Sequence, residues 1–464
     1  MKTNQVYILL LSLFFIACKN KTDNKKTTDS NITTEATVEA IENTNTAKFL
    51  SLSDVHINGN MTETEFGNVS GTQLWSRTKT KIENTVKQEQ PKFMVYLGDL
   101  PAYIDSERAQ NSHLMLENLR NLQIGIPILY LPGNNDSLEG DYHSFTNGNG
   151  NTVLTKDKDS INPWPVLNNK STSIKVSNLD FNKEFGYYSV DLTDNGNTLK
   201  IIALNTVIFS NKIETDIVDN KPDKHPVYNS KQNAQHLYVT GDDGVSQQQA
   251  TQKQMHWFEK KLKSLSSNDR VMIMMHIPIG QDGYGGSQMW NPALTFTTLS
   301  GEEHNLHNGF IDLLDTYKLN ITGLLNGHTH TDGLRRIYKS HKSNVANDMI
   351  SYSISTPGIA VNHDNNPAFK IFTYNTISYD LLDFKTYFAS PTNANHDGDF
   401  QFMKDSMYTF KNIYGIKNAN EPIFKSLANE TDPEIVQHVN TTLGAMSNKD
   451  VKLIYPTAVN VHKN

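Results

Sequence analysis

The sequence predicts an α/β fold, because short apolar runs alternate with amphipathic stretches along most of the chain. The runs of strand length predict strands at 49–52, 93–97, 126–131, 199–204, 271–275 and 321–325. The amphipathic stretches predict helices at 78–88, 112–122, 246–265 and 309–317. In βαβ arrangements of this kind, residues just after the carboxyl ends of the strands face a shared crevice.

Size and charge limit the classes of function. With 464 residues, of which 37% are hydrophobic, the chain is long enough to bury a large core. The formal net charge of −7 argues against general attraction to nucleic acid, so we expect no nucleic-acid partner. The basic pair Arg335-Arg336 has two readings, a local phosphate contact or a solvated surface turn.

The amino terminus predicts an exported protein. Lys2 precedes an apolar stretch at 6–17, which is too short to span a membrane, and Cys18 is the single cysteine of the chain. Ala17-Cys18 resembles the lipobox of bacterial lipoproteins, although Phe15 departs from it. We expect 1–18 to be a lipoprotein signal peptide, with lipidated Cys18 anchoring the protein to the cell envelope, periplasmic or at the cell surface. A simple secretory signal is the alternative.

The remaining chain divides into three predicted parts. Residues 19–47 are polar and have few apolar residues, so we expect a disordered tether. Residues 48–388 hold the alternating strands and helices and form the expected main domain. Met, Phe and Tyr at helical spacing predict a C-terminal helical subdomain over 389–464, with helices at 400–414, 421–427 and 432–443.

Polar residues of the types that bind metals follow the apolar runs in a fixed order. They lie in Ser53-Asp54-Val55-His56, Gly98-Asp99, Gly133-Asn134-Asn135-Asp136, His276, and Gly327-His328-Thr329-His330. Oxygens of carboxylates and amides, mixed with imidazoles and without thiolates, suit Zn, Mn or Fe. We therefore expect two divalent metal ions in a catalytic site, with Zn as the first choice and Mn or Fe as alternatives.

Each motif also has an ordinary structural reading. An Asp after a strand is commonly a cap or turn residue, and His276 alone is more often packed in a core than bound to a metal. The joint occurrence of all the motifs favours the metal site. A two-metal hydrolase needs a carboxylate between ions about 3.5–4 Å apart, and Asp99 is the natural bridge. Gly98 and Gly133 would let the backbone turn tightly beside it.

The order of these motifs resembles the signature of the calcineurin-like metallophosphoesterase superfamily, which reads D-x-H, G-D, G-N-H-D/E, a lone H and G-H-x-H. Further segments resemble the acid sphingomyelinase-like phosphodiesterase branch, namely Gly98-Asp99-Leu100-Pro101-Ala102, Leu204-Asn205-Thr206, His276-Ile277-Pro278 and Asn366-Pro367-Ala368-Phe369. The resemblance covers about 48–388. It implies a double β-sheet sandwich flanked by helices, here with a C-terminal helical extension.

The resemblance also implies a ligand set and a reaction. One metal would be held by Asp54, His56, Asp99 and His330, and the other by Asp99, Asn134, His276 and His328. A hydroxide that bridges the metals would attack phosphorus in line. The implied protein is an exported, metal-dependent phosphohydrolase that cleaves phosphodiesters of the sphingomyelin type or related phosphate esters.

Two positions depart from the family pattern. Asn135 replaces the histidine of G-N-H-D/E, and Tyr103 replaces the branch's histidine after G-D-x-P-A. Neither replacement is a good acid near pH 7. Because the resemblance implies that these two positions are catalytic, we take Asn135 and Tyr103, together with His276, as the candidate catalytic positions. His113 or His143 would be substitutes for the missing acid, although a surface location is the ordinary reading of each.

These departures leave alternatives open. The Gly-Asn-Asn-Asp form also resembles the fungal endopolyphosphatases, so a polyphosphate substrate or a nucleotide pyrophosphatase activity is one alternative. A phosphate leaving group needs less protonation than an alkoxide does. A lipoprotein that binds phosphate ligands without catalysis is another alternative.

Overall fold

The computed structural model describes residues 45–65, 67–146, 152–153, 165–168, 174–212, 245–282, 286–341, 345–363, 365–391, 399–404, 406–429 and 460–463. Asn45–Asn464 form one compact unit. The expected signal peptide with Cys18, most of the tether and the helix predicted at 432–443 lie outside the described residues. The tether predicted through residue 47 overlaps the first strand, which begins at Thr46 because Ala47 and Phe49 enter the core.

The first sheet has seven strands in the order β18-β15-β14-β1-β2-β3-β4. Their bounds, in this order, are Met407–Thr409, Leu381–Phe388, Ala368–Asn375, Thr46–Leu52, Met94–Tyr96, Ile128–Tyr130 and Val166–Leu167. Strands β1, β2 and β3 are mutually parallel, and β14 pairs with β1 in the antiparallel sense. The carboxyl ends of β1, β2 and β3 therefore lie along one edge of this sheet.

The second sheet has eight strands in the order β19-β12-β13-β11-β8-β7-β6-β5. Their bounds, in this order, are Asn460–Val461, Gly333–Tyr338, Met349–Ser355, Ile321–Asn326, Arg270–Met275, Asn197–Leu204, Tyr188–Asp194 and Lys175–Phe181. Strands β7, β8, β11 and β13 are parallel, whereas β5, β6 and β12 pair in the antiparallel sense. Sequence reasoning found the parallel strands β7, β8 and β11 but missed β5, β6 and β12–β15.

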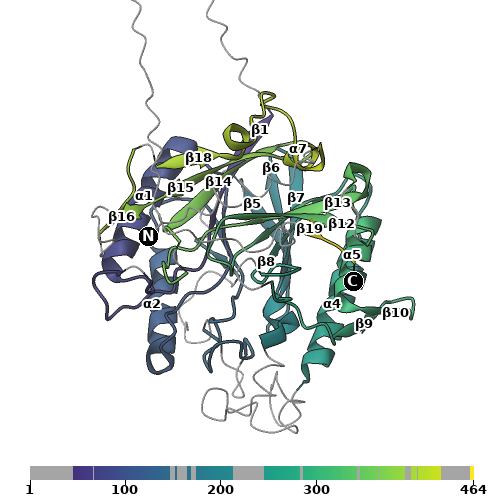
Figure 1. The fold of residues 1–464 in the computed structure, drawn as a ribbon, viewed down its shortest axis with the longest axis horizontal. Coiled ribbons are helices and arrows are strands. Elements are labelled where there is room, and N and C mark those ends of the chain that lie inside the picture. Colours follow the sequence, from purple (N-terminus) through teal and green to yellow (C-terminus); the bar gives the residue numbers. More distant parts are fainter. Residues whose placement is uncertain are drawn as a thin grey trace, which may run out of the picture. The chain divides into compact units, whose positions relative to one another are not determined.

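Helices cover the outer faces of both sheets (Figure 1). The larger helices are α1 (Thr72–Glu89), α2 (Arg108–Arg120), α4 (Gln247–Lys263) and α5 (Leu306–Thr316). Each overlaps a helix that the sequence predicts. Short 3₁₀ turns lie at Asp105–Glu107 (η1), Thr206–Phe209 (η2) and Ala346–Asp348 (η5), and two-stranded ribbons form from β9 (Thr295–Thr297) with β10 (Glu303–Asn305) and from β16 (Ser390–Pro391) with β17 (Phe400–Gln401).

Three hydrophobic clusters separate the layers. Alternate residues of β2 show the division, since Val95 packs in the cluster between the two sheets while Met94 and Tyr96 pack with α1 and α2. On β7, Ile201 faces the cluster between the sheets and Ile202 faces the cluster shared with α4 and α5. A strand with both faces buried needs apolar residues at consecutive positions. The predicted sandwich of two β-sheets flanked by helices is confirmed.

The C-terminal segment contributes strands as well as helices. The stretch predicted as a helix at 400–414 instead contains β17, β18 and the short helix α6 (Phe410–Tyr414), because Met407–Thr409 extends the first sheet beside β15. Helix α7 (Ile423–Asn429) forms where 421–427 was predicted to be helical. Strand β19 pairs with β12. The described residues of 389–464 are thus joined to both sheets.

Arg335 and Arg336 lie on strand β12. Both side chains are buried rather than on a solvated turn, with 5% of each exposed. Arg335 donates to the carbonyl of Gln281 at 2.7 Å, and Arg336 donates to Asn460 Oδ1 at 3.0 Å. The pair therefore holds the C-terminal strand and a neighbouring loop.

Among the described residues, no helix is long and apolar enough to cross a bilayer.

Glu89 at the end of α1 ties this helix to the first sheet. Its carboxylate accepts hydrogen bonds from Lys48 of β1 at 2.7 Å, from Lys385 of β15 at 2.5 Å and from the Tyr387 hydroxyl at 2.6 Å. Partial burial alone would raise the pKa of Glu89. The three donors lower the pKa by more than burial raises it, so the net pKa is about 2. Since the folded pKa lies below the ordinary value of 4.5, the stabilisation is present above about pH 4.5 and is lost as the pH falls toward about 2.

We predict that Glu89→Gln lowers the free energy of unfolding at pH 7 by about 1 kcal/mol, a value kept low because the two lysines that pair with the carboxylate are partly exposed to solvent. The difference from the wild type should shrink below about pH 4. Denaturant unfolding across this pH range measures it. Glu117→Gln, on the exposed face of α2, is the matched control. A difference that does not change with pH would contradict the assignment.

Candidate metal centre

The predicted ligands all follow strands that end at the same side of the sandwich. Asp54 and His56 follow β1, Asp99 follows β2, and Asn134 follows β3 of the first sheet. His276 follows β8, and His328 and His330 follow β11 of the second sheet. The structure therefore brings together all seven residues that the sequence singled out as metal ligands, and both sheets contribute to the site.

The backbone carrying these residues is unusual. Five of the seven have positive φ angles, namely Asp54 (49°), His56 (45°), Asp99 (64°), His328 (73°) and His330 (57°). Non-glycine residues rarely adopt this left-handed conformation, and it persists where surrounding contacts enforce it, often at functional sites. The strain indicates that these side chains are held in place for a purpose other than packing.

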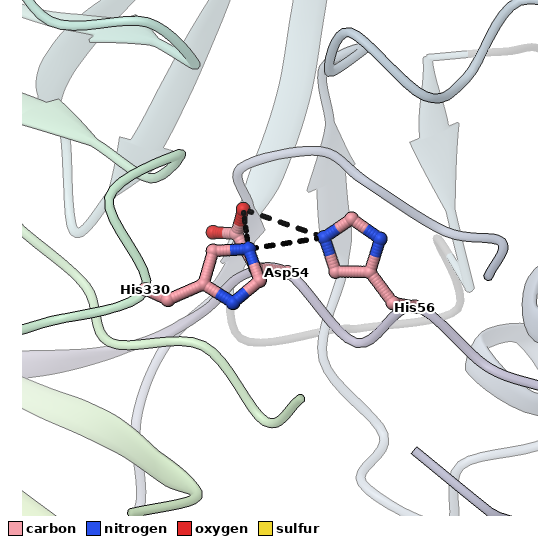
Figure 2. Close-up of side chains that lie close together, drawn as sticks. All are labelled: Asp54, His56 and His330. Carbon is pink, nitrogen blue, oxygen red and sulfur yellow. Dashed lines mark hydrogen bonds and ion pairs between the residues drawn. The ribbon is translucent and has the colours of Figure 1, made fainter. Parts of the chain in front are cut away.

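The first group of ligands consists of Asp54, His56 and His330 (Figure 2). The Nε2 atoms of His56 and His330 lie 3.1 Å apart, and Asp54 Oδ1 lies 3.9 Å from the former and 3.4 Å from the latter. At most 1% of each of these residues is exposed. Three potential ligand atoms thus converge on one buried point.

The second group consists of Asn134, His276 and His328. Asn134 Oδ1 lies 2.9 Å from His276 Nε2 and 2.9 Å from His328 Nδ1. Asp99 lies between the two groups, since its Oδ2 is 3.4 Å from His56 Nε2 and 3.3 Å from His276 Nε2. Asp54 Oδ1 also approaches His276 Nε2, at 4.0 Å. Two carboxylates are therefore available to bind two cations at once.

The tautomers of two histidines fit a metal. His56 Nδ1 lies 3.0 Å from the carbonyl of Pro101, and His276 Nδ1 lies 2.6 Å from the carbonyl of Leu97. Because a carbonyl only accepts, each Nδ1 carries a proton, so Nε2 is the nitrogen whose lone pair each ring could offer to a metal in the cluster. His330 Nδ1 is buried without a hydrogen-bond partner among the described residues. Carboxylate oxygens, an amide oxygen and imidazole lone pairs form a donor set that fits divalent ions.

The electrostatics of the metal-free cluster agree with this fit. Burial lowers the pKa of His56 to about 4 and that of His328 to about 3, so both rings are neutral near pH 7. Burial alone would lower the pKa of His276, but Asp99 and Asp54 raise it above the ordinary range. The His276 charge in turn keeps the pKa of Asp99 below its ordinary range despite burial. In the metal-free protein the proton on His276 thus balances carboxylate charge that a bound metal cation would otherwise balance.

Asp136 organises the loops below the ligands. Its carboxylate accepts hydrogen bonds from the backbone N–H groups of Asp99 (3.0 Å), Leu100 (2.7 Å) and Gly133 (2.7 Å), and from the Tyr130 hydroxyl (2.9 Å). It therefore joins the loops after β2 and β3. Glycine is required here because Gly98 has a φ of 100°, and a Cβ on it would lie 2.5 Å from Gly133 N.

Asn135 does not face the substrate side. It is fully buried, its side-chain N–H donates to Asp99 Oδ2 at 3.2 Å, and its backbone N–H donates to Asp99 Oδ1 at 2.8 Å. The buried guanidinium of Arg108 donates to the Asn135 carbonyl at 2.8 Å and to its Oδ1 at 3.4 Å. Asn135 thus positions Asp99, and its amide carries no titratable proton. Sequence reasoning missed Arg108, because nothing in α2 marks it.

Tyr103 lies at the surface of the first group. Its ring stacks on His56 with centroids 4.5 Å apart, and its hydroxyl lies 3.3 Å from His56 Nε2. Partial burial and the nearby Asp99 charge raise the Tyr103 pKa, although 42% of the residue is exposed to solvent. The phenol is therefore protonated near neutral pH and able to donate a hydrogen bond, but it is a weak acid.

A cleft of about 660 Å³ opens over the cluster. Its lining comprises Asp99, Tyr103, Asn134, Asp141, Tyr142, Ser210, Asn211, Lys212, Asp282, Ser287, Gln288, Met289, His328, Thr329, Asn362 and His363. His113 and His143, the sequence-based substitutes for a missing acid, are absent from this lining. His363, which the sequence analysis did not single out, lines the cleft with its ring 4.4 Å from that of His330.

This centre can bind two divalent cations beside a cleft of substrate size, which is the arrangement of a metallohydrolase. The family model for calcineurin-like phosphoesterases matches residues 47–332, more than half of the chain. The chain therefore belongs to the calcineurin-like phosphoesterase family, a family of enzymes that act on phosphate esters. The resemblance found in the sequence motifs is confirmed.

Curated relatives bear names of the sphingomyelinase-like branch. Cyclic GMP-AMP phosphodiesterase SMPDL3A of Rattus norvegicus is 23% identical over 351 residues, which cover 74% of this chain and 66% of the relative. Sphingomyelinase phosphodiesterase C of Dictyostelium discoideum is 25% identical over 374 residues, covering 75% and 70%. Acid sphingomyelinase-like phosphodiesterase 3b of Homo sapiens is 26% identical over 194 residues, covering 40% and 39%. The chain spans 59–66% of the length of three SMPDL3A relatives that it matches.

We predict that purified protein reconstituted with Zn²⁺ or Mn²⁺ holds close to two metal ions per chain. Asp99→Ala should reduce this number and lower kcat by about 10³-fold or more, because Asp99 contacts both groups of ligands and metal polarisation provides several kcal/mol. Elemental analysis and steady-state kinetics measure both effects. Asp315→Ala, which removes an α5 carboxylate that pairs with Lys318 just after the helix, is the control. Unchanged metal content and turnover in Asp99→Ala would refute a shared ligand.

Proposed function

We propose that the protein is a phosphodiesterase that depends on two divalent metal ions. The observation that carries the proposal is the largely buried cluster of two carboxylates, one amide and four imidazoles that opens into a cleft of about 660 Å³. The names of the curated relatives support a phosphodiester substrate. The sphingomyelin type of diester, which the sequence resemblance implies, is part of the proposal, as are Zn, Mn or Fe as the metals.

Different residues of the cluster would hold each of the two metal ions. Asp54, His56 and His330 would hold one ion, Asn134, His276 and His328 the other, and Asp99 both. Bound ions supply Lewis-acid polarisation of phosphoryl oxygens and a nucleophile at neutral pH. The hydrogen bonds that His56 and His276 donate to the carbonyls of Pro101 and Leu97 keep both rings oriented, and the Tyr103 hydroxyl is available to donate a hydrogen bond to a substrate oxygen.

The charge of the cleft favours a diester over polyphosphate. Outside the metal ligands, the described lining residues include two carboxylates, Asp141 and Asp282, and one ammonium group, Lys212. A channel for a long polyanion would need an excess of positive charge along its walls. This balance supports a substrate with one phosphate at the metals and uncharged or hydrogen-bonding groups along the cleft.

The residues at positions 103 and 135 limit the leaving group. Asn135 is turned away toward Arg108 and Asp99, and Tyr103 stays protonated at neutral pH. Neither provides the proton that an alkoxide leaving group needs. The proposal therefore includes a preference for leaving groups of low pKa.

We predict that log kcat falls steeply as the pKa of the leaving group rises across a series of aryl and alkyl phosphodiesters. Tyr103→His would place an imidazole in the cleft and should raise turnover of alkyl diesters by up to about 10²–10⁴-fold, with little effect on p-nitrophenyl esters. Asn135→His is the comparison variant, because its side chain is buried and should give no such gain.

A flat dependence on leaving-group pKa in the wild type, with chemistry rate-limiting, would show that another cleft residue supplies the proton. Two bound metals without turnover of any ester, nucleotide or polyphosphate would favour the binding-protein alternative. Turnover of polyphosphate exceeding that of all diesters would reverse the preference drawn from the cleft charge.

We further propose that the protein is exported and anchored to the cell envelope through a lipid on Cys18. The support is the sequence of residues 1–18, in which a basic start and an apolar stretch precede the single cysteine.

We predict that Cys18→Ser moves the protein from the membrane fraction to the soluble fraction of the host, since lipid attachment requires the thiol. Metabolic labelling with palmitate, followed by fractionation, is the measurement. Wild-type protein that is unlabelled and already soluble would contradict lipidation.

A further inference from the structure

The orientation of the Asn134 amide decides whether the second group of ligands can hold a metal. Its Oδ1 points between His276 and His328, at 2.9 Å from a ring nitrogen of each. The two ends of a carboxamide have nearly the same shape, but the oxygen accepts and the nitrogen donates. A rotation of 180° would turn the NH₂ group toward the metal position and remove the ligand.

Asp141 fixes this orientation. Asn134 Nδ2 donates to Asp141 Oδ1 at 2.6 Å. An ionised carboxylate has only acceptor oxygens, so the NH₂ end of the amide must face it and the oxygen must face the histidines. Only 4% of Asn134 is exposed, so little water is available to replace this acceptor.

The turn that carries Asp141 is itself held against the same ligands. The backbone N–H of Tyr142 donates to the Asn134 carbonyl at 2.9 Å, and Tyr142 has a φ of 58°. The Tyr142 ring lies edge-on to the ring of His328, with centroids 6.3 Å apart. Residues 141 and 142 therefore contact two of the three ligands in the second group, from the side of the cleft.

We propose that Asp141 is a positioning residue of the second metal site, which holds the Asn134 carboxamide with its oxygen toward His276 and His328. This inference rests on the proposed two-metal function. Partners that orient metal ligands typically change metal affinity by about 10–100-fold when removed. The effect should be confined to one of the two metals, because the Asn134 oxygen lies 2.9 Å from His276 Nε2 and from His328 Nδ1, both in the second group of ligands.

The test compares Zn²⁺ binding to Asp141→Ala, Asp141→Asn and the wild type by competition with a chromophoric chelator. Asp141→Ala should weaken one of the two sites by about 10–100-fold and leave the other within about threefold. Asp141→Asn should restore the affinity to within about threefold of the wild type, because its side-chain oxygen still accepts from Asn134. Asp282→Ala, which removes the other carboxylate that lines the same cleft outside the proposed metal ligands, controls for the loss of charge.

The outcomes separate the two proposals. If the wild type binds no Zn²⁺, the two-metal function fails. If the wild type binds two ions and folded Asp141→Ala binds both with unchanged affinity, the positioning role fails while the function stands. If Asp141→Asn loses affinity as Asp141→Ala does, or Asp282→Ala loses as much, charge rather than orientation explains the effect and the inference is overturned. Thermal unfolding of each variant identifies any loss of fold, and Asp141→Asn keeps the test decisive in that case.

Discussion

The buried carboxylates Asp54 and Asp99 impose the constraint on which the rest of the centre depends. Both are almost completely withdrawn from water, and an unbalanced buried charge is costly. In the metal-free protein a proton on His276, whose pKa is raised, balances the charge of Asp99, while burial raises the pKa of Asp54 to about 7. Divalent cations would replace that proton, so the cluster is stable as a folded structure and also disposed to bind metals.

Polar contacts that cross between the two sheets hold the sheets together near this cluster. Asp332, two residues after His330, follows β11 of the second sheet, yet its buried carboxylate accepts from Lys370 of β14, from Thr386 of β15 at 3.1 Å and from Tyr408 of β18 at 2.7 Å. All three partners belong to the first sheet. Ligands from separate sheets keep short mutual distances because such contacts fix the loops that carry them.

The side-chain amides of the two asparagines in the Gly-Asn-Asn-Asp motif present opposite ends to the metal cluster. Asp141 accepts from the NH₂ group of Asn134 and leaves its oxygen for the metal position. Arg108 donates to the carbonyl oxygens of Asn135 and leaves its NH₂ group for Asp99. Adjacent residues of the same type thus have different roles because their neighbours have opposite hydrogen-bonding character. The replacement of a histidine by Asn135 exchanges a titratable group for a rigid contact to the shared carboxylate.

The sequence by itself determined the seven candidate ligand positions, the alternation of parallel strands and helices, and the family. These features are local, since a period of two or 3.6 residues and a polar residue at a strand end are visible within a short window. Only the tertiary structure decided the parallel strand β13, the antiparallel strands β5, β6, β12, β14 and β15, the cleft position of His363, and the contacts of Asn135, Asn134 and Asp332 with Arg108, Asp141 and Lys370. Each of these depends on which loops meet in space, and Asp332 with Lys370, for instance, joins residues from two different sheets. No periodicity along the chain encodes such a meeting, because it follows from packing the two sheets together.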